Sequence, residues 1–346
     1  MKKVLFATTA LVATAGVASA DIALSGSAQM GIQGGNGNGP GDDTTQFVQD
    51  INVTFTMSGT SDNGLTFGAA IDLSEDAGAV DTDDAGVAIF VSGDFGTLTL
   101  GDTDGALDWA LQEVDFGGAA SINDDHTGHA GFNGNGGLDG HYDGQILRYD
   151  YSFGDFAVAV SVEADDNNNP NAVGVFNLPA TTLATSTADP IWGLGGKYSG
   201  AFAGGTFGVG IGYQFTNDGI DATAATEEVS VLGLSANVAL DSGFSAAINY
   251  STIEIEGANN DGTHFGIGAS YTFDAITVHA NYGAYDWDAG ALSEDAEGFG
   301  LSAAYDFGGG LSAHIGYGYG DVTAVNASGA ALGDNSTWSF GLNMSF

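Results

Sequence analysis

Residues 51–73 read INVTFTMSGTSDNGLTFGAAIDL, two runs in which apolar and polar residues alternate on either side of a turn rich in Ser, Asp and Gly. The apolar positions are Ile51, Val53, Phe55 and Met57 in the first run and Leu65, Phe67, Ala69, Ile71 and Leu73 in the second. Because successive side chains of a strand point to opposite faces, each run predicts a strand with one apolar and one polar face. The stretch therefore predicts an antiparallel β-hairpin.

The same alternation recurs in about sixteen segments, from residues 22–32 to residues 338–346. Short turns, such as GDFG at 93–96, alternate with long acidic connections, such as SEDAGAVDTDDAG at 74–86. Tight turns at one rim and long loops at the other are typical of an up-and-down meander. The sequence therefore predicts an all-β fold of sixteen antiparallel strands.

Two architectures would accommodate this meander: a soluble sheet with an apolar core, or a barrel whose apolar face meets membrane lipid. Strands of about nine to eleven residues match a tilted membrane span. The polar face holds Ser, Thr, Asn, Gly and Ala with very little Lys. Aromatic residues gather at strand ends, as in interfacial girdles; one group is Tyr149, Tyr151, Phe153 and Phe156. One such strand would suit a soluble sheet equally well, but the repetition favours a transmembrane β-barrel, which at sixteen strands encloses an aqueous channel.

The first twenty residues are expected to be a secretory signal peptide. Lys2 and Lys3 form a basic start, an apolar run spans residues 4–17, and residues 18–20 (ASA) match a small-residue cleavage site. Residues 21–346 then form a single barrel domain. No other segment approaches eighteen consecutive apolar residues, so no transmembrane helix is predicted.

The chain is strongly acidic, with 4 Lys+Arg against 44 Asp+Glu. Beyond residue 20, Arg148 and Lys197 are the only Lys or Arg. A nucleic-acid partner is excluded, because phosphate binding requires a basic surface. A hydrophobic fraction of 43% argues against a disordered acidic chain. Cysteine is absent, which excludes disulfides and thiol catalysis, and no Ser-His-Asp or paired-carboxylate arrangement indicates an enzyme.

The third long connection, residues 102–144, has about forty residues, and loops of that length are usually functional or disordered. It begins within GDTDGALDWALQEVDFGG, residues 101–118. The apolar residues Leu107, Ala110, Leu111 and Val114 follow i, i+3, i+4, i+7 spacing, which predicts a short helix with one apolar stripe. The carboxylates in or beside this helix are Asp102, Asp104, Asp108, Glu113 and Asp115.

Several segments resemble the general-diffusion porins of the alphaproteobacterial outer membrane, and the resemblance covers essentially the whole chain beyond residue 20. These segments are DIALSGSAQMGI at 21–32, VTFTMSGTSDNGLTFGAA at 53–70, FVSGDFGTLTLGDTDGALDWAL at 90–111, LRYDYSFGDFAVAVSVE at 147–163 and the terminal Phe346. The resemblance implies a homotrimer of sixteen-stranded barrels in the outer membrane of a Gram-negative bacterium, with passive diffusion of small hydrophilic solutes. It also implies that the third loop folds inward and narrows the pore. Phe346 resembles the signal by which the assembly machinery recognises such barrels.

If the third loop narrows the pore, its five carboxylates would face the lumen; the alternative is a solvated acidic face. Porins of this family oppose such acids with a cluster of arginines on the barrel wall. Here that cluster is reduced to Arg148 and Lys197, which alternation with their neighbours places on inward faces. Because rings of acidic residues favour cations, we expect a cation-selective pore. Adaptation to a saline habitat is a second explanation of the acidity.

Three histidines, His264, His279 and His314, also fall on inward faces of predicted strands. They are expected either to be ordinary polar residues of the lumen or to replace the missing bases as pH-titratable groups. The other three histidines, His126, His129 and His141, lie in the third loop. We expect these to be solvated, although a metal is the alternative.

No cofactor is required for a diffusion channel, but loop-bound Ca²⁺ is suggested by acidic clusters that offer hard oxygen ligands. The clusters are Asp42–Asp43, Asp81 to Asp84, and Asp165–Asp166–Asn167. None has EF-hand spacing. A secreted acidic calcium-binding β-protein or adhesin is therefore an alternative. Another is a substrate-specific outer-membrane channel, for which alternation identifies Tyr285 as the one inward aromatic residue.

Overall fold

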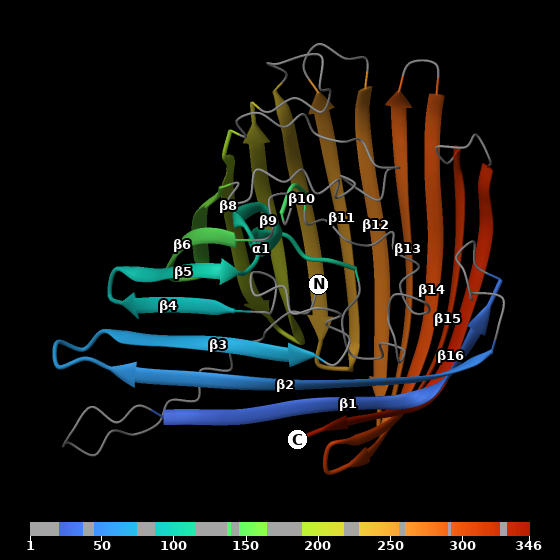
Figure 1. The fold of residues 1–346 in the computed structure, drawn as a ribbon, viewed down its shortest axis with the longest axis horizontal. Helices are drawn as coiled ribbons and strands as arrows, with labels where there is room; N and C mark the ends of the chain where they lie inside the picture. The colour runs from blue at the N-terminus through green and yellow to red at the C-terminus, as the bar shows by residue number, and fades with distance from the viewer. Residues whose placement is uncertain are drawn as a thin grey trace.

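The structure is a computed structural model that describes residues 21–36, 45–74, 87–114, 137–139, 145–164, 189–217, 228–255, 260–289, 292–325 and 331–346. The expected signal peptide lies outside these residues. The described chain forms sixteen strands and one short helix (Figure 1). They are β1 (Asp21–Gly35), β2 (Gln46–Thr60), β3 (Thr66–Ser74), β4 (Ala88–Gly93), β5 (Gly96–Asp102), α1 (Ala106–Ala110), β6 (Gln145–Phe153), β7 (Phe156–Glu163), β8 (Ile191–Phe202), β9 (Gly205–Thr216), β10 (Val229–Leu240), β11 (Phe244–Ile255), β12 (Asn260–Phe273), β13 (Ile276–Ala289), β14 (Leu292–Gly308), β15 (Leu311–Val325) and β16 (Ala331–Ser345).

The strands form one closed antiparallel barrel in which each strand pairs with its neighbours in sequence. The last strand closes the ring on the first, with Ile32 of β1 paired to Phe340 of β16. Closure leaves no strand edge unpaired, which a barrel in lipid requires because hydrocarbon cannot hydrogen-bond the backbone. The predicted sixteen-stranded antiparallel barrel is confirmed.

The barrel wall is uneven in height (Figure 1). The β4 strand has 6 residues and β5 has 7, whereas β14 has 17. The observed strand lengths therefore vary more than the expected nine to eleven residues. Alternation counts only the stretch where one face is apolar, and the tall strands continue beyond it into polar sequence such as the Asp and Glu residues of β14.

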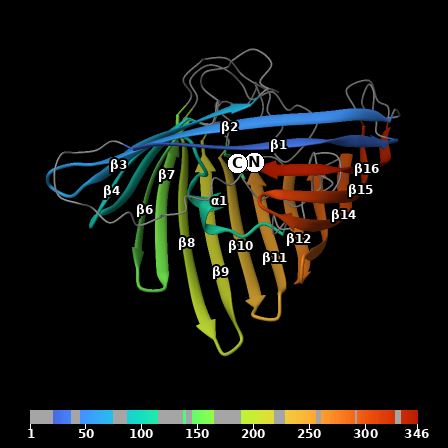
Figure 2. The same ribbon diagram turned by 90° about the horizontal axis from the view of Figure 1, so that it is seen from below.

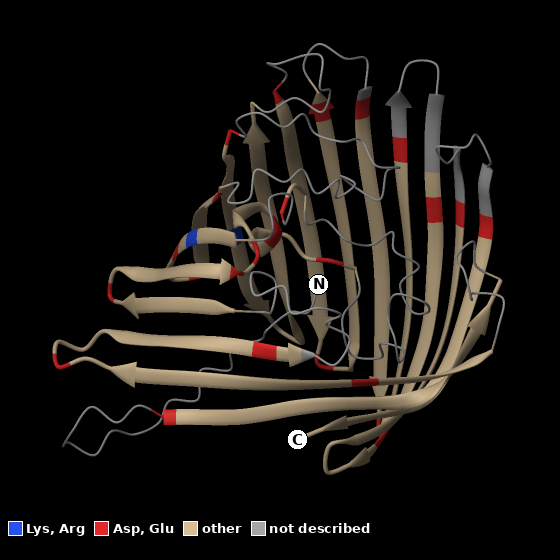
Figure 3. Cartoon of the chain, in the orientation of Figure 1, with Lys and Arg blue, Asp and Glu red and all other residues tan. Residues whose placement is uncertain are grey.

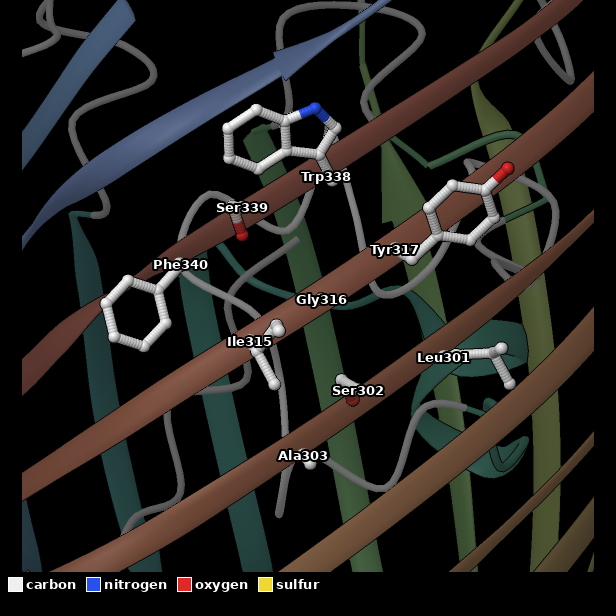
Figure 4. Close-up of a pocket in the computed structure, with 9 residues that line it drawn as sticks. All are labelled: Leu301, Ser302, Ala303, Ile315, Gly316, Tyr317, Trp338, Ser339 and Phe340. Atoms are coloured by element: carbon white, nitrogen blue, oxygen red, sulfur yellow. The ribbon is translucent and has the colours of Figure 1, made fainter. Parts of the chain in front are cut away.

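The outward face is apolar along the whole ring. Leu24, Leu194 and Ile211 expose 65%, 53% and 52% of their surface, which would be a liability in water but suits a barrel that faces lipid. Between β14 and β16 this face has a shallow groove of about 590 Å³, with backbone as its floor (Figure 4). Its outward side chains are Leu301, Ala303, Ile315, Tyr317, Trp338 and Phe340.

The inward face combines small and polar side chains with buried apolar ones: Gln214, Asn249 and Ser251 are at most 1% exposed, and so are Val231 and Ile253. The α1 helix contacts the inner face of β7, β8 and β9. In the part of the chain that the structure describes, no helix is long and apolar enough to cross a membrane.

The α1 helix is shorter than the apolar spacing suggests. It ends at Ala110, and Leu111 is already extended, with φ −88° and ψ 156°. The four apolar residues of the predicted stripe, Leu107, Ala110, Leu111 and Val114, are nevertheless all buried. The Leu111 N–H still donates to the Leu107 carbonyl at 3.1 Å, but the Gln112 N–H donates to the barrel wall in place of a helical carbonyl, so the helix does not continue.

Candidate functional site

The described part of the third loop leaves the wall after β5 and runs along the inside of the barrel (Figure 2). At the start of α1, the Ala106 N–H donates to Ser161 Oγ of β7 at 2.9 Å. The preceding Gly105 N–H donates to Asp139 Oδ2 at 2.7 Å. Asp139 belongs to the returning part of the same loop, so this contact joins the two arms of the loop beside the wall.

The loop backbone lies directly on glycines of the inner wall. A Cβ atom at Gly195 of β8 would be 1.9 Å from the Ala106 carbonyl oxygen, and one at Gly210 of β9 would be 2.0 Å from the Ala110 carbonyl oxygen. No side chain fits at such distances, so only glycine permits this approach. We call the inward glycines that the loop covers the glycine track: Gly195, Gly210, Gly212, Gly233 and Gly268.

Beyond α1 the loop continues across the wall as an extended segment. The Gln112 N–H donates to Ser235 Oγ of β10 at 2.9 Å, and Asn249 Nδ2 of β11 donates to the Gln112 carbonyl at 3.3 Å. His279 Nε2 of β13 lies 3.1 Å from the Val114 carbonyl oxygen. The described part of the loop is thus anchored from β7 to β13.

Both basic side chains beyond residue 20 reach the loop; Figure 3 colours the Lys and Arg positions of the described chain blue. Arg148 Nη1 of β6 donates to the Asp104 carbonyl at 2.5 Å, and Arg148 Nε lies 3.5 Å from Asp150 Oδ1. Lys197 Nζ of β8 donates to the Trp109 carbonyl at 3.0 Å. Both bases therefore lie on the side of the barrel where the loop docks.

The predicted pore acids are in different surroundings. Asp108 and Glu113 are each 9% exposed, Asp104 is half-buried, and Asp102 is exposed at the end of β5. Asp104 precedes α1 and Glu113 follows it, so these acids do not form a single row on a helix. Asp115 lies outside the described residues.

The two remaining inward histidines lie on β12 and β15. His264 of β12 is fully buried, and its ring centroid is 4.4 Å from that of Tyr285 of β13. His314 Nε2 of β15 is 2.7 Å from Ser312 Oγ. A second aromatic residue also faces inward, although alternation did not single it out. It is Phe90 of β4, which is half-buried between the exposed Ile89 and Val91.

Two further carboxylates, on β2 and β3, lie on the interior face of the wall, and both strands carry red acidic positions in Figure 3. Asp50 of β2 is paired with Gln29 of β1, and its neighbour Ile51 faces outward at 48% exposure. Asp72 of β3 is paired with Thr54, whose hydroxyl donates to it. In the ring order β2 is six strands from β8. The opening hairpin already placed Asp72 in its polar set, but sequence reasoning gave neither acid a role.

Asp139 is a carboxyl group of the described part of the loop with a displaced pKa that the structure explains. Burial raises its pKa from 3.8 to about 8; the hydrogen bond from Gly105 lowers it, and the negative charge of Glu163 raises it again. Gln214 Nε2 also donates to Asp139, and Gln214 Oε1 accepts from the Leu138 N–H at 2.8 Å. A neutral carboxyl group is therefore favoured at this anchor around neutral pH.

Within the described ranges, no group of three or more His, Asp or Glu residues is arranged to hold a metal ion. The acidic clusters expected to bind Ca²⁺ fall outside these ranges, as do the third-loop histidines His126, His129 and His141. Loop-bound calcium therefore stays a prediction.

Comparison with known proteins agrees with this geometry. The model of the Gram-negative porin family matches residues 7–325. A porin of Rhodobacter capsulatus is 29% identical over 316 residues, which cover 84% of this chain and 92% of that protein. A porin structure refined at 1.8 Å resolution has a TM-score of 0.64 at 26% identity and covers 94% of this chain and 100% of its own.

A more distant structure shares only the fold. OmpT of Vibrio cholerae in its trimer form has a TM-score of 0.59 at 14% identity and covers 95% of this chain and 100% of its own. The family match spans most of the chain, and the closed barrel of sixteen strands accompanies it. The chain therefore belongs to the Gram-negative porin family and is a channel protein of the outer membrane, not an enzyme.

Proposed function

We propose that this porin is a cation-selective channel for small hydrophilic solutes and ions, with the third loop as its constriction. One observation supports the proposal: carboxylates, some half-buried and some largely buried, lie on the loop and on the facing inner wall, while both bases beyond residue 20 contact the loop backbone. The acids are Asp104, Asp108 and Glu113 on the loop and Asp50 and Asp72 on the facing wall. A lumen lined by one sign of charge concentrates ions of the opposite sign.

Single-channel reversal potentials across a salt gradient test this proposal. We expect wild type to prefer cations, and we expect the double variants Asp50→Asn/Asp72→Asn and Asp104→Asn/Asp108→Asn each to lower that preference. Asp241→Asn is the matched control, because Asp241 is an exposed acid in the turn after β10. An anion-preferring or unselective wild-type pore would overturn the proposal.

The same variants separate pore selectivity from adaptation to a saline habitat. If the acidity serves only solvation, Asp241→Asn should change the reversal potential as much as the loss of an interior acid does. If it serves selectivity, only interior acids should matter. Because the chain belongs to the Gram-negative porin family and lies in the outer membrane, it is not a secreted calcium-binding protein or adhesin. Among the described strand residues, the inward aromatics Phe90 and Tyr285 are too few to form an aromatic track, which disfavours a substrate-specific channel.

The proposal includes a homotrimer, supported by the trimer form of Vibrio cholerae OmpT, which shares the fold. Native mass spectrometry of detergent-extracted protein checks this. A threefold mass is the expected result, and a monomer that conducts ions in bilayers would contradict it.

A further inference from the structure

Trp109 of α1 is the loop residue that both bases approach. Lys197 Nζ lies 3.6 Å from the centroid of its indole ring, and the Arg148 guanidinium carbon lies 5.9 Å from it. Both distances are within the roughly 6 Å at which a cation is attracted to an aromatic face. Indole is the strongest partner among the aromatic side chains.

The same two bases also hydrogen-bond to the backbone of the loop, at Trp109 and just before α1. Lys197 donates to the carbonyl of Trp109 itself, and Arg148 donates to the carbonyl of Asp104, just before α1. Each base thus makes one polar and one aromatic contact with the same six-residue stretch, residues 104–109. Such paired contacts fix a position, whereas a base that only tunes the field of the lumen would need neither.

We infer that Lys197 and Arg148 are positioning residues that clamp the third loop against the wall at Trp109. This inference rests on the proposed role of the loop as the constriction. In the described interior, the clamp explains why two bases can remain in an otherwise acidic pore: their positive charge is directed at loop carbonyls and the indole face. Loss of the clamp should free α1 and let it move within the lumen.

Three variants separate a clamp from a simple lumen charge. Lys197→Met removes the charge but keeps the length, Lys197→Arg keeps the charge, and Trp109→Leu removes the ring without changing any charge. Trp192→Leu is the matched control, because Trp192 lies on β8 but faces outward at 50% exposure. Refolding of each variant is checked by its β-sheet circular dichroism.

Single-channel recordings provide the first readout. We expect closing events to become about three- to thirtyfold more frequent in Lys197→Met and Trp109→Leu, the factor that corresponds to a lost cation–π contact. Lys197→Arg and Trp192→Leu should close as rarely as wild type. The inference would be overturned if Trp109→Leu closed as rarely as wild type, or if Lys197→Arg closed more often than wild type. Trp109→Met, which also removes the ring, replaces Trp109→Leu if the latter does not fold.

Fluorescence of Trp109 provides a readout that does not depend on conduction. The chain has 4 Trp, so a background that combines Trp192→Phe, Trp287→Phe and Trp338→Phe leaves Trp109 as the only indole. We expect acrylamide to quench Trp109 more strongly after Lys197→Met and equally after Lys197→Arg. Unchanged quenching in Lys197→Met would contradict the clamp. Reversal potentials report on selectivity separately, so a failed clamp and a failed cation-selective pore give different results.

Discussion

The position of a Cβ atom at Gly195 lies only 1.9 Å from the carbonyl oxygen of Ala106. The wall and the third loop are therefore in contact through backbone on both sides, with no side chain between them. Gly210 and Ala110 repeat the relationship one strand further, at 2.0 Å. Because the backbone of the wall cannot yield without breaking the ladder of the barrel, the loop is the part that must move when a side chain is added.

We predict that Gly195→Ala and Gly210→Ala displace the third loop while the barrel stays folded. Single-channel conductance should change, and the loop should become cleavable by a protease added to refolded protein. Gly196→Ala is the control, because it is the next residue of β8 and a Cβ there meets only Ile211 Cγ2 at 3.8 Å. Wild-type conductance in both Gly195→Ala and Gly210→Ala would contradict this role of the glycine track.

The barrel itself could be predicted from the sequence, because period-two alternation records which face of each strand meets lipid. The hairpin at residues 51–73 shows this, since Ile51 is exposed outward and Asp72 lies on the interior face. Strand length was less predictable. The long polar ends of β14 leave the apolar band, and no pattern in the sequence distinguishes them from loops.

The site was predictable only in part. The apolar spacing identified the four buried residues, but the helical wheel extended past Ala110, because the hydrogen bonds that end α1 come from distant strands such as β10. The glycine track had a signal, the inward glycines in GLGGK at 193–197 and GVGIG at 208–212. Its meaning depends on which loop lies over it, and that is a tertiary fact. Alternation placed Lys197 inward but could not show that Trp109 would meet it.

Selectivity should weaken in concentrated salt. The Debye length falls from about 10 Å at 0.1 M to about 3 Å at 1 M, so mobile ions screen Asp50 and Asp72 from the centre of a water-filled lumen. We expect the reversal potential, at a fixed ratio of salt activities, to approach zero as the concentration rises. Uptake of a neutral sugar by liposomes is the control and should not change. Equal selectivity at both salt concentrations would indicate a closer ion-binding site in place of a diffuse field.

The terminal Phe346 is predicted to serve assembly rather than stability. Its backbone N–H donates to the Gly26 carbonyl at 2.9 Å, but its side chain is 80% exposed. Phe346→Ala should therefore refold in detergent as wild type does, yet reach the outer membrane of cells in severalfold smaller amounts. Phe307→Ala is the control, an exposed Phe at another turn with 56% exposure. If Phe346→Ala fails to refold in detergent, the residue has a structural role.

Asp139 should make the anchor of the loop sensitive to pH. Its folded-state pKa is raised to about 8 because burial disfavours the charged form. The folded protein therefore retains a proton that the unfolded chain releases near pH 4, so the contribution of this group to stability falls as pH rises from about 4 to about 8. Above that range the ionised group lies near the negative charges of Glu163 and Asp104.

We expect closing events of the single channel to increase as pH is raised from 6 to 9. Asp139→Asn should remove most of this dependence, because an amide stays neutral and can still accept the Gly105 N–H. Asp241→Asn, an exposed turn acid, should keep the wild-type response. A flat wild-type profile would show that ionised Asp139 is accommodated by the donors Gly105 and Gln214. A response that persists in Asp139→Asn would place the titrating group elsewhere in the pore.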